Sequence, residues 1–226
     1  MNRGYELHTL KVGLNFTRNF SYILVDNASR QAAVVDPAWD LDVILDKIRA
    51  LGVELTTILL THSHDDHVNR VDALLQIYPA AQVYMSKQEI VTYGFSCANL
   101  FPFGDGEMIW LGETPITCLV TAGHTAGGAC FLLEDDLLSG DTVFIEGCGI
   151  CDTVGGSPVQ MYESLQKIRR LVAPHVRVFP GHSYGKEPGA PLRVLLSSNI
   201  YFQFEKVEHF VQFRMRKNQR GSLNFK

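Results

Sequence analysis

The chain has 226 residues, of which 46% are hydrophobic and 19% charged, and its formal net charge is -4. This length and composition predict one folded domain with a sizeable buried core. The mild negative charge argues against a nucleic-acid partner, and no apolar run is long enough to cross a bilayer. No apolar signal-peptide core follows residues 1–6, so the sequence predicts a cytoplasmic protein without a membrane contact.

The first sixty residues predict strands, then a helix, then a further strand. Short β-prone segments between polar turns indicate strands over residues 5–12, 20–26, 31–36 and 56–60. Before the last of these, apolar residues recur at helical spacing from Leu41 to Leu51, and Gly52 is expected to end that helix. The strand at 56–60 leads directly into a cluster of histidines.

The middle of the chain predicts a helix, a strand and a loop. Apolar residues from Val68 to Tyr78 have helical spacing and Pro79 follows them, so we expect a helix there. A strand is expected at 82–85. Residues 93–105 contain glycine and proline and show no clear period, which indicates a loop.

The second half repeats the order of strands, helix and strand. Its predicted strands cover residues 108–111, 116–121, 129–134, 137–138 and 176–179. Helices are expected from Val159 to Val172 and in the tail from Leu192 to Phe213. Because no linker separates the halves, we expect a single α/β domain over residues 1–226, with a helical tail at about 190–226 and two packed sheets between outer helices.

Residue types that bind metals are concentrated in the segment THSHDDH at residues 61–67, which holds three of the eight histidines. Further candidates directly follow other predicted strands, in TAGHTAGG, LLSGDTVF and VFPGHSYG. The carboxyl ends of strands are where open α/β sheets build their sites. The candidate ligands are His62, His64, Asp66, His67, His124, Asp141 and His182.

These candidates outnumber the four ligands that one tetrahedral metal needs, water included. The set fits two metals that share one carboxylate. A donor set rich in imidazole suits zinc, and iron or manganese would also accept it. His8, His175 and His209 are interpreted as ordinary polar residues because none lies in such a motif.

The motif H-x-H-x-D-H, followed by separate His, Asp and His motifs, resembles the metallo-β-lactamase superfamily. The resemblance implies a four-layer αββα sandwich with its site between the sheets. It also implies that one metal would be held by His62, His64 and His124, and the other by Asp66, His67 and His182, with Asp141 bridging. Asp36 matches a family aspartate at a strand end, so it is expected either to orient a ligand or to cap the strand.

Two further segments, GDTVFIEGCGICDTVGG and GHSYG, resemble the glyoxalase II branch of this superfamily. The second makes Tyr184 a candidate substrate contact. Ile150 stands where glyoxalase II has a basic residue for glutathione and where the related persulfide dioxygenases have arginine, and the tail is shorter than in glyoxalase II. As a whole the chain is similar to the stand-alone zinc hydrolases found with bacterial polyketide synthases, which cleave acyl thioesters of carrier proteins.

The resemblance implies a thioesterase with two Zn²⁺ per chain, in which Asp66 both binds metal and orients the proton of the nucleophile. Three alternatives stay open: glyoxalase II, a persulfide dioxygenase with one iron, and a non-enzymatic, metal-stabilised module that binds carrier proteins. The tail adds a basic cluster, interpreted either as a solvated end or as a dock for an acidic carrier protein or the phosphate of its pantetheine arm. This cluster comprises Arg214, Arg216, Lys217 and Arg220.

Overall fold

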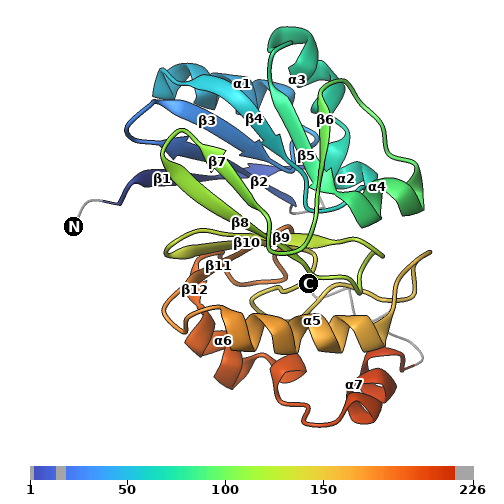
Figure 1. The fold of residues 1–226 in the computed structure, drawn as a ribbon. Helices are drawn as coiled ribbons and strands as arrows, with labels where there is room; N and C mark the ends of the chain where they lie inside the picture. Colours follow the sequence, from blue (N-terminus) through green and yellow to red (C-terminus); the bar gives the residue numbers. More distant parts are fainter. Residues whose placement is uncertain (1–2, 14–18, 217–226) are drawn as a thin grey trace.

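Two six-stranded sheets face each other in the computed structural model, which describes residues 3–13 and 19–216 (Figure 1). The first sheet runs in the order β1 (Tyr5–Val12), β2 (Asn19–Asp26), β3 (Gln31–Val35), β4 (Glu54–Leu59), β5 (Gln82–Ser86) and β6 (Leu100–Phe103). The second runs β12 (Ala190–Pro191), β11 (Arg177–Pro180), β10 (Asp136–Gly140), β9 (Ala129–Leu132), β8 (Thr114–Val120) and β7 (Met108–Leu111).

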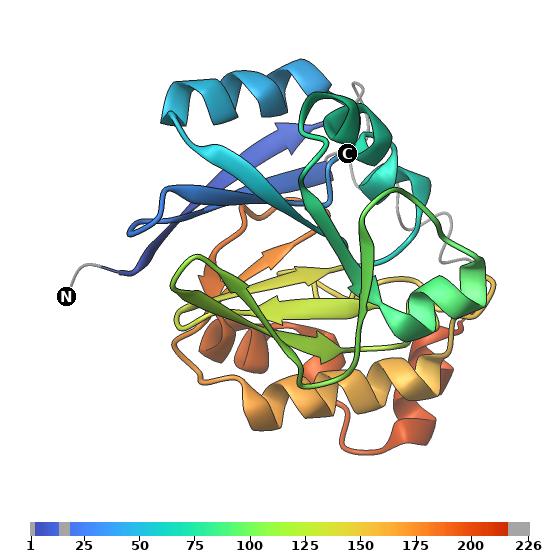
Figure 2. The same cartoon turned by 45° about the horizontal axis from the view of Figure 1, so that its top comes forward.

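Helices cover the outer faces of both sheets, as Figures 1 and 2 show from two directions. Those associated with the first sheet are α1 (Leu41–Leu51), α2 (Asp65–Val68), α3 (Val71–Ile77) and α4 (Lys87–Tyr93). Those associated with the second are α5 (Pro158–Leu171), α6 (Leu192–Ser198), the 3₁₀ helix η1 (Ile200–Phe202) and α7 (Val207–Arg214). The predicted α/β sandwich, with two sheets inside and helices outside, is confirmed.

Alternation along the strands divides the core into layers. In β2, Ile23 and Val25 pack in the cluster that also buries Ile44 of α1, whereas Tyr22 and Leu24 pack in the cluster between the two sheets. Successive strand residues point to opposite faces, so a fully buried strand such as β2 carries apolar residues on both. A third cluster lies between the second sheet and α5, α6 and α7.

One edge of the sandwich collects the carboxyl ends of several strands. β3, β4, β5 and β6 are parallel, and so are β10 and β11. Bonds between the sheets fasten this edge: Phe20 N donates to Gly181 O at 2.9 Å, and Ala129 N donates to Thr61 O at 2.8 Å. The loops that follow β4, β8, β10 and β11 therefore meet here, and these loops carry the candidate ligands.

Most predicted elements are confirmed, and the helix at 41–51 matches α1 residue for residue. Gly52 ends it with a left-handed φ of 60°, a conformation that glycine adopts without a steric penalty. The loop predicted over 93–105 is wrong in part, because it contains β6. This strand is at the sheet edge, where its Pro102 is tolerated.

Two predicted helices are interrupted. The helix expected from Val68 to Tyr78 breaks at Asn69, whose side chain accepts from Trp39 N at 2.9 Å. The helix expected from Leu192 to Phe213 breaks again at 203–206, and it first breaks at Asn199, whose amide donates to Phe144 O at 3.0 Å and Gly147 O at 2.9 Å. In both cases side-chain bonds to a distant loop override helical spacing. Among the helices of the described residues, none is long and apolar enough to span a bilayer.

Candidate metal centre

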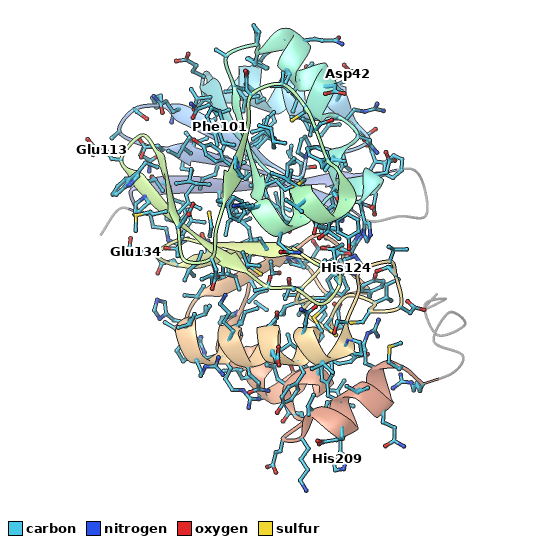
Figure 3. All side chains as sticks on the ribbon, turned by 45° about the vertical axis from the view of Figure 1, so that its right-hand side comes forward. Asp42, Phe101, Glu113, His124, Glu134 and His209 are labelled. Atoms are coloured by element: carbon cyan, nitrogen blue, oxygen red, sulfur yellow. The ribbon has the colours of Figure 1, made fainter. Side chains whose placement is uncertain are left out.

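All seven predicted ligands converge at the edge where the strand ends meet. Figure 3 shows His124 between the two halves of the molecule, on the side away from Glu113 and Glu134. The ligand atoms form three overlapping groups whose members lie within 4.8 Å of one another, and one of them, with His62, His67 and Asp141, links the other two. The three-histidine group comprises His62, His64 and His124, and the mixed group comprises Asp66, His67 and His182.

The three-histidine group has the spacing of a metal site. His64 Nδ1 lies 3.1 Å from His62 Nε2 and 3.0 Å from His124 Nε2. Nitrogens about 2.0–2.1 Å from a tetrahedral zinc are roughly 3.3 Å apart. The three nitrogens therefore already surround a point that a zinc-sized cation fits.

The mixed group has similar spacing, and Asp141 contacts both groups. His182 Nε2 lies 3.3 Å from His67 Nε2 and 3.3 Å from Asp66 Oδ2. Asp141 Oδ1 is 3.5 Å from His67 Nε2, and its Oδ2 is 3.4 Å from His124 Nε2. One carboxylate thus stands between the two groups, as the predicted bridging role requires.

Hydrogen bonds on the outer nitrogens point the inner lone pairs at the centre. His124 Nδ1 donates to the carbonyl of Ile150 at 2.7 Å, and His67 Nδ1 donates to Asp36 Oδ2 at 2.9 Å. His62 Nδ1 donates at 3.1 Å to Thr61 Oγ1, whose own proton goes to Asp36. In the neutral form of these three imidazoles, Nε2 carries no proton and faces other ligand atoms, which is the arrangement that a bound cation stabilises. The donor set therefore fits zinc.

Asp36 performs both of the roles that its position predicts. It is 3% exposed and has a φ of 48°. Besides orienting His67, its carboxylate accepts from Thr61 N at 2.8 Å and from Thr61 Oγ1 at 2.6 Å. It therefore fixes the end of β4 at the residue before the first histidine of the cluster.

Comparison with known proteins places this geometry in a family. Residues 15–95 match the model of the metallo-beta-lactamase superfamily. A probable polyketide biosynthesis zinc-dependent hydrolase of Bacillus velezensis, BaeB, is 50% identical over 226 residues, which is 100% of both chains. This chain belongs to the metallo-beta-lactamase superfamily.

Two other members extend the comparison. A human hydroxyacylglutathione hydrolase-like protein is 35% identical over 173 residues, covering 74% of this chain and 56% of that protein. The crystal structure of ETHE1 from Myxococcus xanthus superimposes with a TM-score of 0.84 at 27% identity, over 94% of this chain and 91% of that one. The sandwich is thus the metallo-beta-lactamase fold.

In this metallo-beta-lactamase centre, the histidine pKa values are lowered in one group and raised in the other. Burial, reinforced by neighbouring histidines, holds the pKa of His62 well below its usual value, and burial likewise lowers the pKa of His64. Burial also acts against protonation of His67, but Asp141 and Asp36 outweigh it and raise its pKa to about 9. Asp141 and Asp66 raise the pKa of His182 against the effect of burial. Protons are therefore held more tightly in the mixed group.

Of the predicted catalytic and substrate residues, Asp66 belongs to the mixed group, Tyr184 lies near it, and Ile150 contacts His124 of the three-histidine group. The side chain of Asp66 is 35% exposed, and its Oδ2 accepts from Asn19 Nδ2 at 3.1 Å. Burial alone would raise the pKa of Asp66, but the hydrogen bond from His182 and the charge of His67 lower it well below its usual range. Asp66 is thus a carboxylate at neutral pH.

Tyr184 is 41% exposed, and its ring centre lies 5.2 Å from that of Phe144. Burial of its hydroxyl, followed by the charge of Asp141, raises its pKa well above the usual value. Its hydroxyl therefore keeps its proton and can donate it to a bound group. Ile150 reaches the centre through its carbonyl on His124, and its side chain is partly buried.

Part of the predicted basic cluster is buried and not exposed on the surface. Arg214 is 7% exposed, and its Nη1 donates to Tyr201 Oη at 2.9 Å. Its place at the end of α7, packed on η1, turns it inward, so both interpretations of this residue, as part of a solvated end and as a docking contact, are wrong. Arg216 is exposed, with its guanidinium 3.9 Å from the ring centre of Phe213. Lys217 and Arg220 lie outside the described residues.

Sequence reasoning missed α4 and the buried Glu89 that it carries next to the centre. The sequence does contain a signal for this helix. Ser86 and Glu89 form the S-x-x-E pattern of a helix start, and Ser86 Oγ accepts from Glu89 N at 3.1 Å. Apolar periodicity does not find α4, because its buried face is occupied by a carboxylate.

Proposed function

We propose that this chain is a two-zinc hydrolase of thioesters, acting on acyl groups attached to a carrier protein or a pantetheine thiol in polyketide biosynthesis. The full-length similarity to a probable polyketide biosynthesis zinc-dependent hydrolase supports the reaction class and the setting. The observation that carries the proposal is the pair of ligand groups that share Asp141. A structural zinc site is closed and needs only four ligands, so a purely structural role does not account for seven.

The proposed chemistry depends on a metal pair and on Asp66. When bound, two zinc ions would supply Lewis acidity and a water that ionises near neutral pH. Asp66 is partly exposed and ionised, so it can accept a hydrogen bond from the attacking water and orient its remaining lone pair toward a carbonyl. Asn19, which donates to the same carboxylate oxygen, limits the rotation of that group.

A thioester suits a centre with many ligands and no free acid. The leaving thiol has a pKa of about 8.5, so it departs as a thiolate without a strong general acid. Tyr184 retains its proton and is partly exposed beside the centre. We assign it a hydrogen bond to the acyl or pantetheine part of the substrate rather than a proton-transfer role.

A second candidate, hydrolysis of the glutathione thioester as in glyoxalase II, is favoured by the 35% identity to the hydroxyacylglutathione hydrolase-like protein. It would use the same centre and differ in the thiol that is recognised. Ile150 offers no charge for the carboxylates of glutathione, so the carrier-bound substrate is the better fit.

A substrate panel tests the proposal. Metal-replete protein is assayed for thiol release from acyl pantetheine, from an acyl carrier protein loaded with the same acyl group, and from S-lactoylglutathione. We expect kcat/KM for the carrier-bound ester to exceed that for the glutathione ester by at least about tenfold. The reverse order would assign the second candidate, and no thiol release from any of the three would refute thioester hydrolysis.

A further inference from the structure

Glu89 is a completely buried carboxylate at the start of α4, directly behind the metal centre. Its exposed fraction is 0%. A charged side chain is buried at this level only where hydrogen bonds replace its water. Its position in the first turn of a helix that leaves β5 places the carboxylate between the two sheets, and no step of the proposed chemistry uses it.

Three donors from two loops satisfy this carboxylate. Oε1 accepts from Ser63 N at 2.9 Å and from Ser63 Oγ at 2.8 Å. Oε2 accepts from Gly127 N at 2.9 Å. The neighbouring Ser86 Oγ also donates to the carbonyl of Gly127, so α4 holds both backbone groups of this residue.

Both loops carry members of the three-histidine group. Ser63 lies between His62 and His64 in the loop after β4 of the first sheet. Gly127 lies three residues after His124 in the loop between β8 and β9 of the second sheet. A single carboxylate therefore ties together the two segments whose separation sets the distances within this group.

The contact with Gly127 leaves no room for a side chain. A Cβ at this position would lie 2.1 Å from Glu89 N, far inside any van der Waals contact. The backbone of the loop can approach α4 this closely only because the residue is glycine. The loop that carries Gly127 therefore packs directly against the backbone of α4 at Glu89.

The orientation of His64 depends on the Glu89 hydrogen bonds more than that of the other ligands does. The outer nitrogens of His62, His124 and His67 each have a partner that fixes the ring. For His64 the described part of the chain provides no such partner, because both of its side-chain contacts there are made by Nδ1. Its orientation is then set by its backbone, which Glu89 holds at the preceding residue.

We propose that Glu89 is a positioning residue of the three-histidine group, as Asp36 is for His67 of the mixed group. It fixes the backbone at Ser63 and Gly127, and through them it sets His64 against His62 and His124 before a metal binds. The inference rests on the metal-binding part of the proposed function and is independent of which thioester is cleaved.

Zinc titration of paired variants tests this role. Competition with a chromophoric chelator measures the zinc affinity of Glu89→Gln in two backgrounds. The Asp66→Ala background leaves the three-histidine group intact, and the His64→Ala background leaves the mixed group intact. Glu163→Gln, an exposed carboxylate on α5, is the matched control in both.

In Asp66→Ala, we expect Glu89→Gln to weaken zinc binding by about 10- to 100-fold, the range seen when partners of metal ligands are removed. In His64→Ala its effect should stay within about threefold. Equal losses in the two backgrounds, or no loss in the first, would overturn the proposal. Equal losses in both backgrounds are what a defect of the whole fold would produce.

A milder variant covers the case in which Glu89→Gln does not fold, as judged by circular dichroism. Ser63→Ala removes one of the three hydrogen bonds and keeps the backbone donor. We expect a loss of about three- to tenfold confined to the Asp66→Ala background, and an equal loss in both backgrounds would again overturn the proposal. If the wild type bound two zinc ions but released no thiol, the proposed function would fail. The zinc titration would still decide whether Glu89 positions the three-histidine group.

Discussion

The three-histidine group and the mixed group lie side by side but differ in charge, exposure and support. The first consists of three imidazoles, and burial lowers the pKa values of His62 and His64. The second includes a partly exposed carboxylate, and its histidine pKa values are raised. The difference suggests a division of labour: a set of imidazoles that holds a cation firmly, and a partly exposed set with a carboxylate that meets water and substrate.

Removing the carboxylate that both groups share should have the largest effect. Asp141→Asn keeps the size of the side chain but removes the charge that faces His67 and His124. We expect kcat/KM to fall by at least about 10³-fold, equivalent to about 4 kcal/mol. Zinc stoichiometry should fall in the same variant, and a loss of only one ion would show that Asp141 belongs to one group.

The next variant removes a ligand from the mixed group alone. Asp66→Ala should lower kcat by about 10²- to 10³-fold, because it removes both a ligand and the group that orients the nucleophile. Asp65→Ala is the control, since this neighbour on α2 is exposed and its side chain accepts one hydrogen bond from the described residues, from Asn69 Nδ2 at 3.4 Å. Wild-type turnover in Asp66→Ala would remove this residue from the mechanism.

Asp36 is expected to support the mixed group directly, through its bond to His67, and the three-histidine group only through Thr61. Asp36→Asn places an amide donor among three donors, so one of the bonds to Thr61 or His67 must be lost. Zinc affinity of the mixed group should fall about 10- to 100-fold, measured by chelator competition in the His64→Ala background. An unchanged affinity would restrict Asp36 to capping the strand.

Lowering the pH should weaken zinc binding more in the mixed group than in the three-histidine group. In the metal-free protein the pKa of His67 is raised to about 9, so a proton competes with metal for its Nε2 at neutral pH. Metal affinity of the mixed group should fall about tenfold for each pH unit below 9, whereas the lowered pKa of His62 protects the other group. Equilibrium dialysis from pH 8 to 6 should show zinc leaving the mixed group first, and the opposite order would contradict the comparison.

The smallest effect is expected at Tyr184. Tyr184→Phe keeps the ring against Phe144 and removes the hydroxyl. We expect KM for carrier-bound thioester to rise about three- to tenfold, the value of one hydrogen bond, with kcat nearly unchanged. A large fall in kcat would instead place the hydroxyl at the reacting atoms.

The sequence predicts the ligands more completely than the groups that support them. His62, His64 and His67 are recognisable because they are close in the chain, and the other ligands because each follows a strand signal. Glu89 contacts Ser63 and Gly127 across 26 and 38 residues, and no local pattern encodes such a contact. Helical spacing fails in the same way at Asn69 and Asn199, where bonds to distant loops end the helices.

The most direct test of the two-metal account is a zinc titration followed by thioester hydrolysis. Metal-free protein receives increasing equivalents of zinc, and thiol release from an acyl carrier protein is measured at each step. The account predicts that activity rises until two equivalents are bound and then stays constant. Full activity at one equivalent, or activity that requires a single iron and O₂ instead of zinc, would contradict it.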